Sequence, residues 1–196
     1  MTIPRTALTE RYVDAIRYAA AAHANQVRKG TDVPYIAHLL GVSSLVLEAG
    51  GDEDQAIAGL LHDTGEDCGG EPRLADVRAR FGPDVEAIVR GCSDSLDEEW
   101  KRVTPWRVRK QFYLDRMAVE SDRIVVVSVA DKVHNGRAIV TDLQITGADV
   151  MAKFTEPTLV VWYYREVLGI AVDREVPREL VDPLRTAVDQ IEALLG

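Results

Sequence analysis

The sequence predicts an all-α bundle, because apolar residues recur at helical spacing in successive segments and glycine, proline or a capping residue marks most of their boundaries. One β-branched run, Ile124–Val127, has the composition of a buried strand, but no partner strand is evident elsewhere. A chain of 196 residues with 46% hydrophobic content suits one compact core. We therefore predict a single all-α domain over residues 1–196.

The first three helices are expected to follow one another closely. The first covers residues 8–29, with Arg28–Lys29 and Gly30 placed as a helix C-terminus favours cations and glycine. The second carries YIAHLLGVSSLVLEA and ends at Gly50–Gly51. Asp52 is then expected to cap the helix that carries LLHD.

Two short helices, PRLADVRARF and PDVEAIVRG, are predicted next, with Gly82 between them. A polar connection around Ser93–Glu99 leads to a helix after Pro105. On this helix four side chains are spaced to share one side, as part of the core or of a groove wall: Trp106, Lys110, Tyr113 and Met117.

For DRIVVVSVADKVHNGRAIV we favour a helix over a strand, because Ser121 can cap it and the polar residues Asp131, His134 and Asn135 then fall at helical intervals. Two more helices are expected near Pro157–Leu168 and Pro177–Leu195. The motif-bearing core thus spans about residues 8–146, and C-terminal helices span about residues 157–195.

Composition narrows the class of protein. The formal charge of −9 argues against broad binding to nucleic acid, although Arg28–Lys29 and Lys101–Lys110 are either local anion sites or solvated faces. The apolar runs are too short for a membrane span, and MTIPRTALTERY lacks the apolar core of a signal peptide, so a cytoplasmic location is expected. Cys68 and Cys92 lack CxxC spacing, which suits reduced thiols with packing roles.

The segment LLHDTGED concentrates four ionisable groups: His62, Asp63, Glu66 and Asp67. Three carboxylates close together repel one another unless a cation offsets them, so a multivalent metal is a reasonable inference. An exposed polar helix end is the alternative. His38 and Asp131 are candidates for a third and a fourth ligand, and each is equally well explained as a structural residue.

Three motifs occur in order: RKGTDVPYIAH, LLHDTGED and VADKVHNGR. Together they resemble the HD-domain hydrolases of the RelA/SpoT type, especially the free-standing small alarmone hydrolases, over roughly residues 19–139. The resemblance implies an all-α HD bundle that removes the 3′-pyrophosphate from the stringent-response nucleotides ppGpp and pppGpp. The synthetase and regulatory domains of the long RelA/SpoT proteins have no room in this chain.

The resemblance also implies a role for individual residues. It implies one Mn²⁺ per chain on the ligand positions His38, His62, Asp63 and Asp131. It implies that Glu66 and Asp67 handle the attacking water, and that Arg28, Lys29 and Asn135 contact the substrate.

The chain departs from the family pattern at one position, where His38 is followed by Leu39 rather than proline. His134 falls in the variable pair before Asn135 and is expected to pack or hydrogen-bond at the edge of the site. His23 is expected to be structural.

Direct attack by water is favoured over a covalent route, because no serine or cysteine lies in a recognisable nucleophile motif. Two alternatives stay open. One is a phosphohydrolase acting on another nucleotide, such as a pyrophosphorylated adenosine nucleotide, NADPH or a deoxynucleotide. The other is a non-catalytic nucleotide-sensing module. Apolar helix stripes serve cores and interfaces alike, so a homo-oligomer is also left open.

Overall fold

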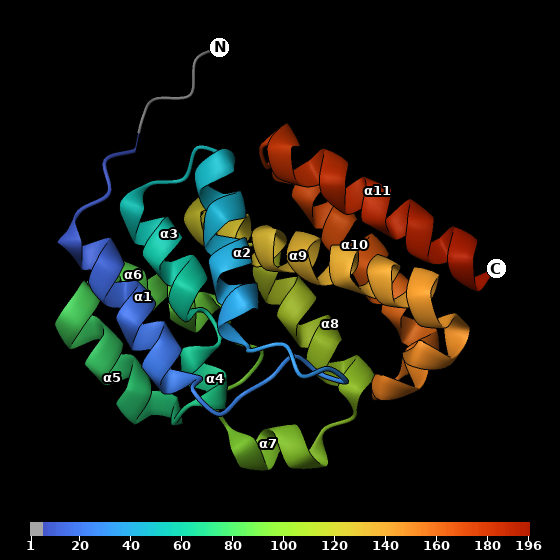
Figure 1. Ribbon diagram of the computed structural model, residues 1–196, viewed down its shortest axis with the longest axis horizontal. Helices are drawn as coiled ribbons and strands as arrows, with labels where there is room; N and C mark the ends of the chain where they lie inside the picture. The colour runs from blue at the N-terminus through green and yellow to red at the C-terminus, as the bar shows by residue number, and fades with distance from the viewer. Residues whose placement is uncertain (1–5) are drawn as a thin grey trace.

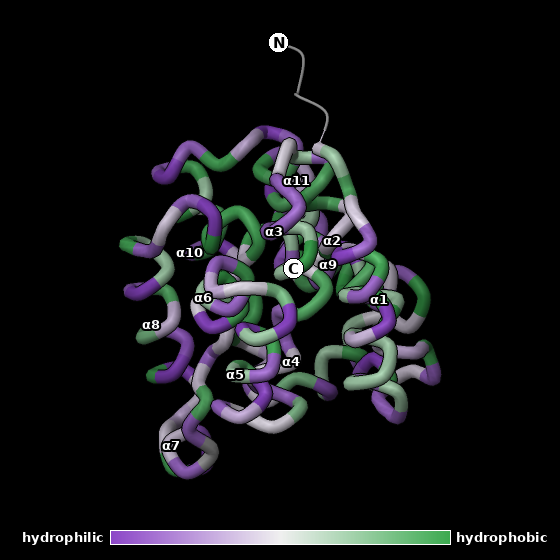
Figure 2. Tube along the Cα trace, turned by 90° about the vertical axis from the view of Figure 1, so that its left-hand side faces the viewer, coloured by the Kyte–Doolittle hydropathy of each residue, from purple (hydrophilic) through white to green (hydrophobic). Residues whose placement is uncertain are grey.

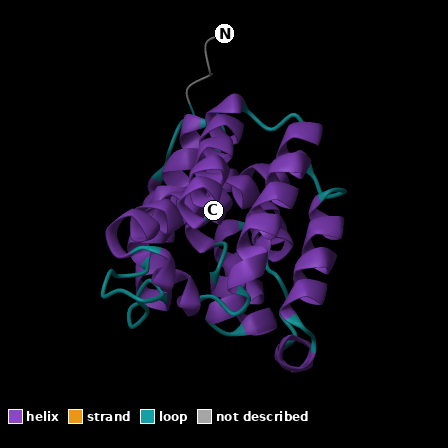
Figure 3. Ribbon diagram, turned by 90° about the vertical axis from the view of Figure 1, so that its right-hand side faces the viewer, coloured by secondary structure: helices purple, strands orange, loops and turns teal. Residues whose placement is uncertain are grey.

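The structure is a computed structural model that describes residues 6–196, and its regular elements within that range are all helices (Figure 3). The all-α prediction is therefore confirmed. We predict no signal peptide in the stretch MTIPRTALTERY. Its first five residues, 1–5, lie outside the described residues. In the described part of the chain, no helix is long and apolar enough to cross a membrane.

The helices follow the predicted order, with some additions. Their bounds are α1 Glu10–Ala22, α2 Ile36–Glu48, α3 Glu53–Leu61, α4 Thr64–Asp67, α5 Gly70–Phe81, α6 Pro83–Cys92, α7 Glu98–Val103, α8 Trp106–Met117, α9 Asp122–Thr146, the 3₁₀ helices η1 Ala148–Lys153 and η2 Pro157–Leu159, α10 Val160–Asp173 and α11 Arg178–Leu195.

Helix α9 is the centre of the bundle (Figure 1). It packs against α2, α3 and α6 on one side and against α10 and α11 on the other. Its β-branched run explains this position, because Val125 and Val127 are fully buried and Ile124 nearly so. Figure 2 shows hydropathy changing within single outer helices, as expected where one face of each covers this core.

The first predicted helix is too long. Helix α1 ends at Ala22, and the chain then forms a loop in which Val27 and Pro34 make an antiparallel bridge. The backbone N–H of Arg28 donates to the Val33 carbonyl at 2.8 Å, and Gly30 turns the chain with a φ of +79°. The predicted cations and glycine thus belong to a turn, which resembles a helix C-terminus in sequence because both need a left-handed glycine.

Other boundaries were predicted with mixed success. Asp52 caps α3 through its side chain, as predicted, in a reciprocal arrangement with Gln55. Ser121 occupies the N-cap position of α9, but its side chain makes no capping hydrogen bond. The short helix α7 was not predicted within the polar connection that precedes Pro105. Asp97 caps it by accepting from the Trp100 backbone N–H at 2.9 Å.

Candidate metal centre and substrate cavity

His62 lies at the junction between α3 and α4 rather than inside one continuous helix. Helix α3 approaches α2 closely at Gly59, where a Cβ atom would lie 3.1 Å from the Cα atom of Ser43. The Nδ1 of His62 pairs with the Gly59 carbonyl at 2.9 Å, which requires a proton on Nδ1. This leaves the buried Nε2 without a hydrogen-bond partner among the described residues.

The other three predicted ligands lie near that nitrogen. The four ligands come from three separate segments. The Nε2 of His62 lies 3.0 Å from Asp63 Oδ2 and 3.6 Å from Asp131 Oδ1. The Nε2 of His38 lies 3.2 Å from Asp131 Oδ1 and 3.7 Å from Asp63 Oδ2. Helix α2 supplies His38, the α3–α4 junction supplies His62 and Asp63, and α9 supplies Asp131.

The spacing of these donors fits a metal ion. Nitrogen and oxygen ligands about 2.1 Å from one ion are separated from each other by about 3.0–3.6 Å. The donors of His38, His62 and Asp131 all lie within 4.8 Å of one another, and Asp63 adds a fourth donor beside both histidines. A buried imidazole nitrogen that lacks a partner is expected where a metal bond replaces the hydrogen bond.

The electrostatics of the cluster favour a bound cation. Burial lowers the pKa of His62, but Asp63 and Asp131 outweigh it and hold the pKa well above the usual value. Burial raises the pKa of Asp131, but Lys132 and the two histidines outweigh it and hold the pKa well below the usual value. The protein therefore stabilises positive charge between these carboxylates, as a proton or as a metal.

Polar neighbours fix the orientation of both carboxylate ligands. The hydroxyl of Tyr35 donates to Asp63 Oδ2 at 2.7 Å. The side-chain amide of Asn135 donates to Asp131 Oδ1 at 2.5 Å, and its oxygen accepts from Arg28 at 2.7 Å. The predicted substrate residues Arg28 and Asn135 thus connect directly to a predicted metal ligand.

Glu66 and Asp67 follow on α4 but face different partners. Glu66 accepts from the backbone N–H of Asp94 at 2.9 Å and lies 3.6 Å from Lys101 Nζ. Asp67 accepts from Gln26 at 2.8 Å and is the more exposed of the two. Burial is the largest cause that raises the pKa of each carboxyl, and for Asp67 the charge of Asp63 raises it further.

A cavity of about 560 Å³ opens beside the ligand cluster. His38 and Tyr35 form part of one wall. Five basic side chains line the cavity: Arg28, Lys29, Lys110, Lys132 and Lys153. Among the described residues of the lining, Asp142 is the one acidic side chain, and it pairs with Lys153. In a chain of net charge −9 this is a local concentration of positive charge, suited to a polyanionic ligand.

A model of the family described as "HD domain" matches residues 15–158. The chain belongs to the HD-domain family. It is 34% identical over 138 residues to the guanosine-3′,5′-bis(diphosphate) 3′-pyrophosphohydrolase MESH1 of Drosophila melanogaster, covering 69% of this chain and 70% of that protein. It is 33% identical to a probable guanosine-3′,5′-bis(diphosphate) 3′-pyrophosphohydrolase of Synechocystis, covering 64% of this chain but 16% of that longer protein.

A solved structure of a metazoan ortholog of SpoT, described as hydrolysing ppGpp with a role in starvation responses, superposes on this HD domain with a TM-score of 0.74. The two chains are 28% identical, and the match covers 95% of this one and 98% of the other. The predicted resemblance is therefore confirmed. Membership of the HD-domain family indicates a divalent-metal site, which the cluster of His38, His62 and Asp131 suits.

Other cavity residues of this HD domain lie outside the predicted site set, although Trp106 and Lys110 were predicted to form core or a groove wall and Lys110 belongs to a possible anion site. Lys132 lies inside the VADKVHNGR motif and lines the cavity while pairing with Asp131. Trp106 and Lys110 come from the predicted stripe of α8, whose other members, Tyr113 and Met117, are buried. Lys153 comes from η1, for which the sequence offered no motif.

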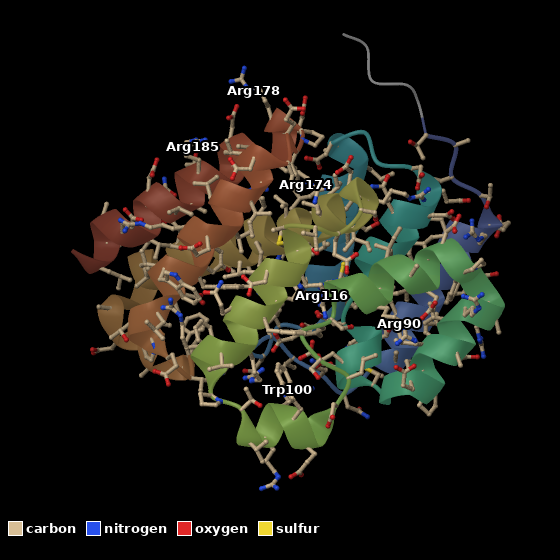
Figure 4. The ribbon with its side chains drawn as sticks, turned by 180° about the vertical axis from the view of Figure 1, so that it is seen from behind. Arg90, Trp100, Arg116, Arg174, Arg178 and Arg185 are labelled. Carbon is tan, nitrogen blue, oxygen red and sulfur yellow. The ribbon has the colours of Figure 1, made fainter. Side chains whose placement is uncertain are left out.

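Two regions outside the cluster also carry side chains of the kinds that bind ligands. His23 is buried, as expected of a structural residue, and its Nδ1 pairs with Gln26 Oε1 at 2.6 Å. A second hollow lies between the end of α6, α7 and α8, where Figure 4 labels Arg90, Trp100 and Arg116. Its lining holds two acidic side chains, Asp94 and Asp97, beside these two arginines, so it is poorly suited to an anion.

Proposed function

We propose that this protein is a Mn²⁺-dependent hydrolase that removes the 3′-pyrophosphate from ppGpp and pppGpp. The observation that carries the proposal is a ligand cluster beside a cavity lined by five basic side chains, with His38 belonging to both the cluster and the lining. The similarity to pyrophosphohydrolases of that specificity supports the choice of substrate.

The proposed metal ligands are His38, His62, Asp63 and Asp131. A divalent metal, when bound, supplies Lewis-acid polarisation of a phosphoryl oxygen and makes water a nucleophile near neutral pH. Two imidazoles and two carboxylates form a donor set without thiolate, which suits Mn²⁺ among the borderline and hard divalent ions. Four protein donors would leave positions for water and substrate on an ion that takes six ligands, as a catalytic site requires.

Glu66 and Asp67 are the proposed residues that orient and deprotonate the attacking water. A general base works best when its pKa lies near the working pH, so the burial that raises the pKa of Glu66 favours this role. The Asp94 backbone N–H and Lys101 hold the Glu66 carboxylate in place. Gln26 does the same for Asp67.

Arg28, Lys29 and Asn135 are the proposed substrate contacts. Arg28 lies 5.8 Å from the Tyr35 ring centre and bonds Asn135, so its planar group is held at the cavity wall for phosphate or base. Lys29 is exposed and acts as a point charge. We add Lys110, Lys132 and Lys153 as further charges that attract the two diphosphate groups of the substrate.

A substrate panel in the presence of Mn²⁺ tests the proposal. The purified chain is given ppGpp, pppGpp, a pyrophosphorylated adenosine nucleotide, NADPH and a deoxynucleoside triphosphate, with pyrophosphate and monophosphate release measured separately. We expect pyrophosphate release from the guanosine substrates with the highest kcat/KM. Monophosphate release from NADPH at higher efficiency would favour another substrate, and tight ppGpp binding without turnover would favour a sensing module.

The choice of metal is tested on the same reaction. Chelated enzyme is reloaded with Mn²⁺, Mg²⁺, Zn²⁺ or Co²⁺ and assayed on ppGpp. We expect Mn²⁺ to restore the largest kcat/KM. Full recovery with Zn²⁺ alone would contradict the proposed metal while leaving the proposed reaction intact.

The proposed setting is a cytoplasmic enzyme that takes part in the stringent response, with a small nucleotide as its ligand. Measuring ppGpp in starved cells with and without the gene tests this setting. We expect slower ppGpp decline in cells that lack it.

A further inference from the structure

His134 touches a proposed metal ligand from the side opposite the cluster. Its Nδ1 lies 2.9 Å from the Nδ1 of His38, and the two ring centres are 4.8 Å apart. The other nitrogen of His38, Nε2, faces the carboxylates of Asp131 and Asp63. His38 is almost fully buried, with a relative exposure of 1%, so its two nitrogens depend on these neighbours.

The arrangement fixes where the proton of His38 must lie when a metal is bound. A neutral imidazole carries one proton, and the nitrogen that binds a metal must present its lone pair. Because Nε2 of His38 faces the cluster, its proton is then on Nδ1. Nδ1 therefore donates, and the Nδ1 of His134 accepts. Such partners of metal-bound histidines fix both the tautomer and the orientation of the ring.

Helix α2 is adapted to the ring of His134. At Gly41, inside α2, a Cβ atom would lie 2.3 Å from both Cδ2 and Nε2 of His134. Any side chain at that position would displace the ring from its present contact with His38. Glycine is otherwise unfavourable in a helix interior, so its presence here is consistent with making room for this ring.

We propose that His134 is a positioning residue, seated by Gly41, that holds His38 in the tautomer and orientation which bind the metal. The inference rests on the proposed metal centre and goes beyond it, because it assigns a role to two residues outside the ligand set. The opposing explanation is that His134 only fills space between α2 and α9.

Metal affinity of a matched pair of variants distinguishes these explanations. His134→Asn keeps an acceptor oxygen near the place of Nδ1, whereas His134→Leu keeps similar volume without an acceptor. Titration of the metal-free full chain with Mn²⁺ should show affinity about 10- to 100-fold weaker for His134→Leu and near wild type for His134→Asn. Equal affinities in the two variants, whether normal or weakened, would overturn the proposal. Melting of the metal-free variants checks that both fold.

The glycine is tested against another helical glycine. Gly41→Ala should weaken Mn²⁺ binding about tenfold or more, while Gly169→Ala in α10, where a Cβ atom has nothing within 4 Å, should not. In the His134→Leu background, Gly41→Ala should cause little further loss. Wild-type Mn²⁺ affinity in Gly41→Ala would overturn the role of Gly41.

The proton itself is observable by NMR of the Zn²⁺-loaded, ¹⁵N-labelled chain, which contains four histidines. We expect a protected Nδ1–H signal from His38 in wild type and in His134→Asn, and its loss in His134→Leu. A protonated Nε2 in the loaded wild type would overturn the proposal. These measurements need no nucleotide. If the chain bound metal as expected here but did not hydrolyse ppGpp, the proposed function would be wrong and the role of His134 would stand.

Discussion

The two ends of the proposed active site are built differently. At the metal end, His38 and His62 are at most 3% exposed and come from helices packed in the centre of the bundle. At the substrate end, Arg28 and Lys29 stand on a loop, and Lys153 comes from a 3₁₀ helix far along the chain. The metal end thus has its geometry fixed by core packing, while the substrate end adds these surface segments to Lys132 and Asn135 of α9.

This difference predicts different responses to substitution. A ligand removed from a buried cluster leaves the remaining donors unable to hold the ion, so the loss should be near complete. A charge removed from a cavity with five basic groups leaves four others in place, so the loss should be partial. Substitutions at the metal end should therefore have the largest effects, and substitutions far from both ends the smallest.

Asp63→Asn is expected to abolish activity. The amide keeps the shape of a half-buried side chain but loses the negative charge beside His62. We expect a fall in kcat/KM well beyond the ~10- to 100-fold that loss of a supporting group costs a metal site. Isothermal titration with Mn²⁺ and an assay on ppGpp measure both effects, and circular dichroism checks the fold. Activity within about tenfold of wild type would contradict the assignment of Asp63 as a ligand.

Glu66→Gln is expected to reduce kcat by about 10²–10⁴-fold while leaving Mn²⁺ affinity unchanged. Glutamine can still accept from the Asp94 backbone N–H, so the local structure should persist. Single-turnover kinetics on ppGpp separate this effect from substrate binding. Loss of Mn²⁺ affinity in this variant would instead place Glu66 among the ligands.

The pH profile gives a second test of Glu66. Burial raises the pKa of its carboxyl, and a general base must be deprotonated to accept a proton. Activity should therefore be full above this raised pKa and fall as the pH drops through it. We expect the acid limb of kcat to lie above the usual carboxyl range in wild type and to change in Glu66→Gln. An identical acid limb in both proteins would assign it to another group.

The metal end could be predicted from the sequence because its residues lie in short motifs with helical or adjacent spacing. His62 and Asp63 are neighbours, and Asp131 and Asn135 are one helical turn apart on α9. Their approach across the core depends on Gly59, whose contact with α2 no local pattern indicates. The ligand roles themselves remain predictions.

The substrate end was predicted only in part. Arg28, Lys29 and Asn135 were identified through motifs, whereas Lys153 was not, because nothing near it in sequence indicates that η1 folds back to the loop of residues 23–35. The same loop was mistaken for the end of α1, since a turn and a helix C-terminus share cations followed by glycine. Tertiary contacts decide both points.

Lys153→Met tests whether the substrate end responds in a graded way. The substitution keeps the apolar stem and removes one of the five cavity charges. We expect KM for ppGpp to rise about tenfold, which corresponds to ~1.4 kcal/mol, with kcat changed little. Arg178→Gln removes a charge from α11, where the side chain is 86% exposed (Figure 4), and should leave both constants unchanged. A large loss of kcat in Lys153→Met would show that the substrate end is as intolerant as the metal end.

The smallest effect is expected far from both ends. Gly169 lies inside α10, and a Cβ atom there would meet nothing within 4 Å. Alanine has a higher helix propensity than glycine, so Gly169→Ala should raise the free energy of unfolding by about 0.5–1 kcal/mol. Denaturant melts measure the gain, and kcat/KM on ppGpp should stay at the wild-type value because α10 reaches the cavity through other residues, Val160, Tyr163 and Tyr164. If the variant were more stable but less active, the substrate end would need motion of α10. The cavity would then depend on the helices of the bundle more than its surface segments imply.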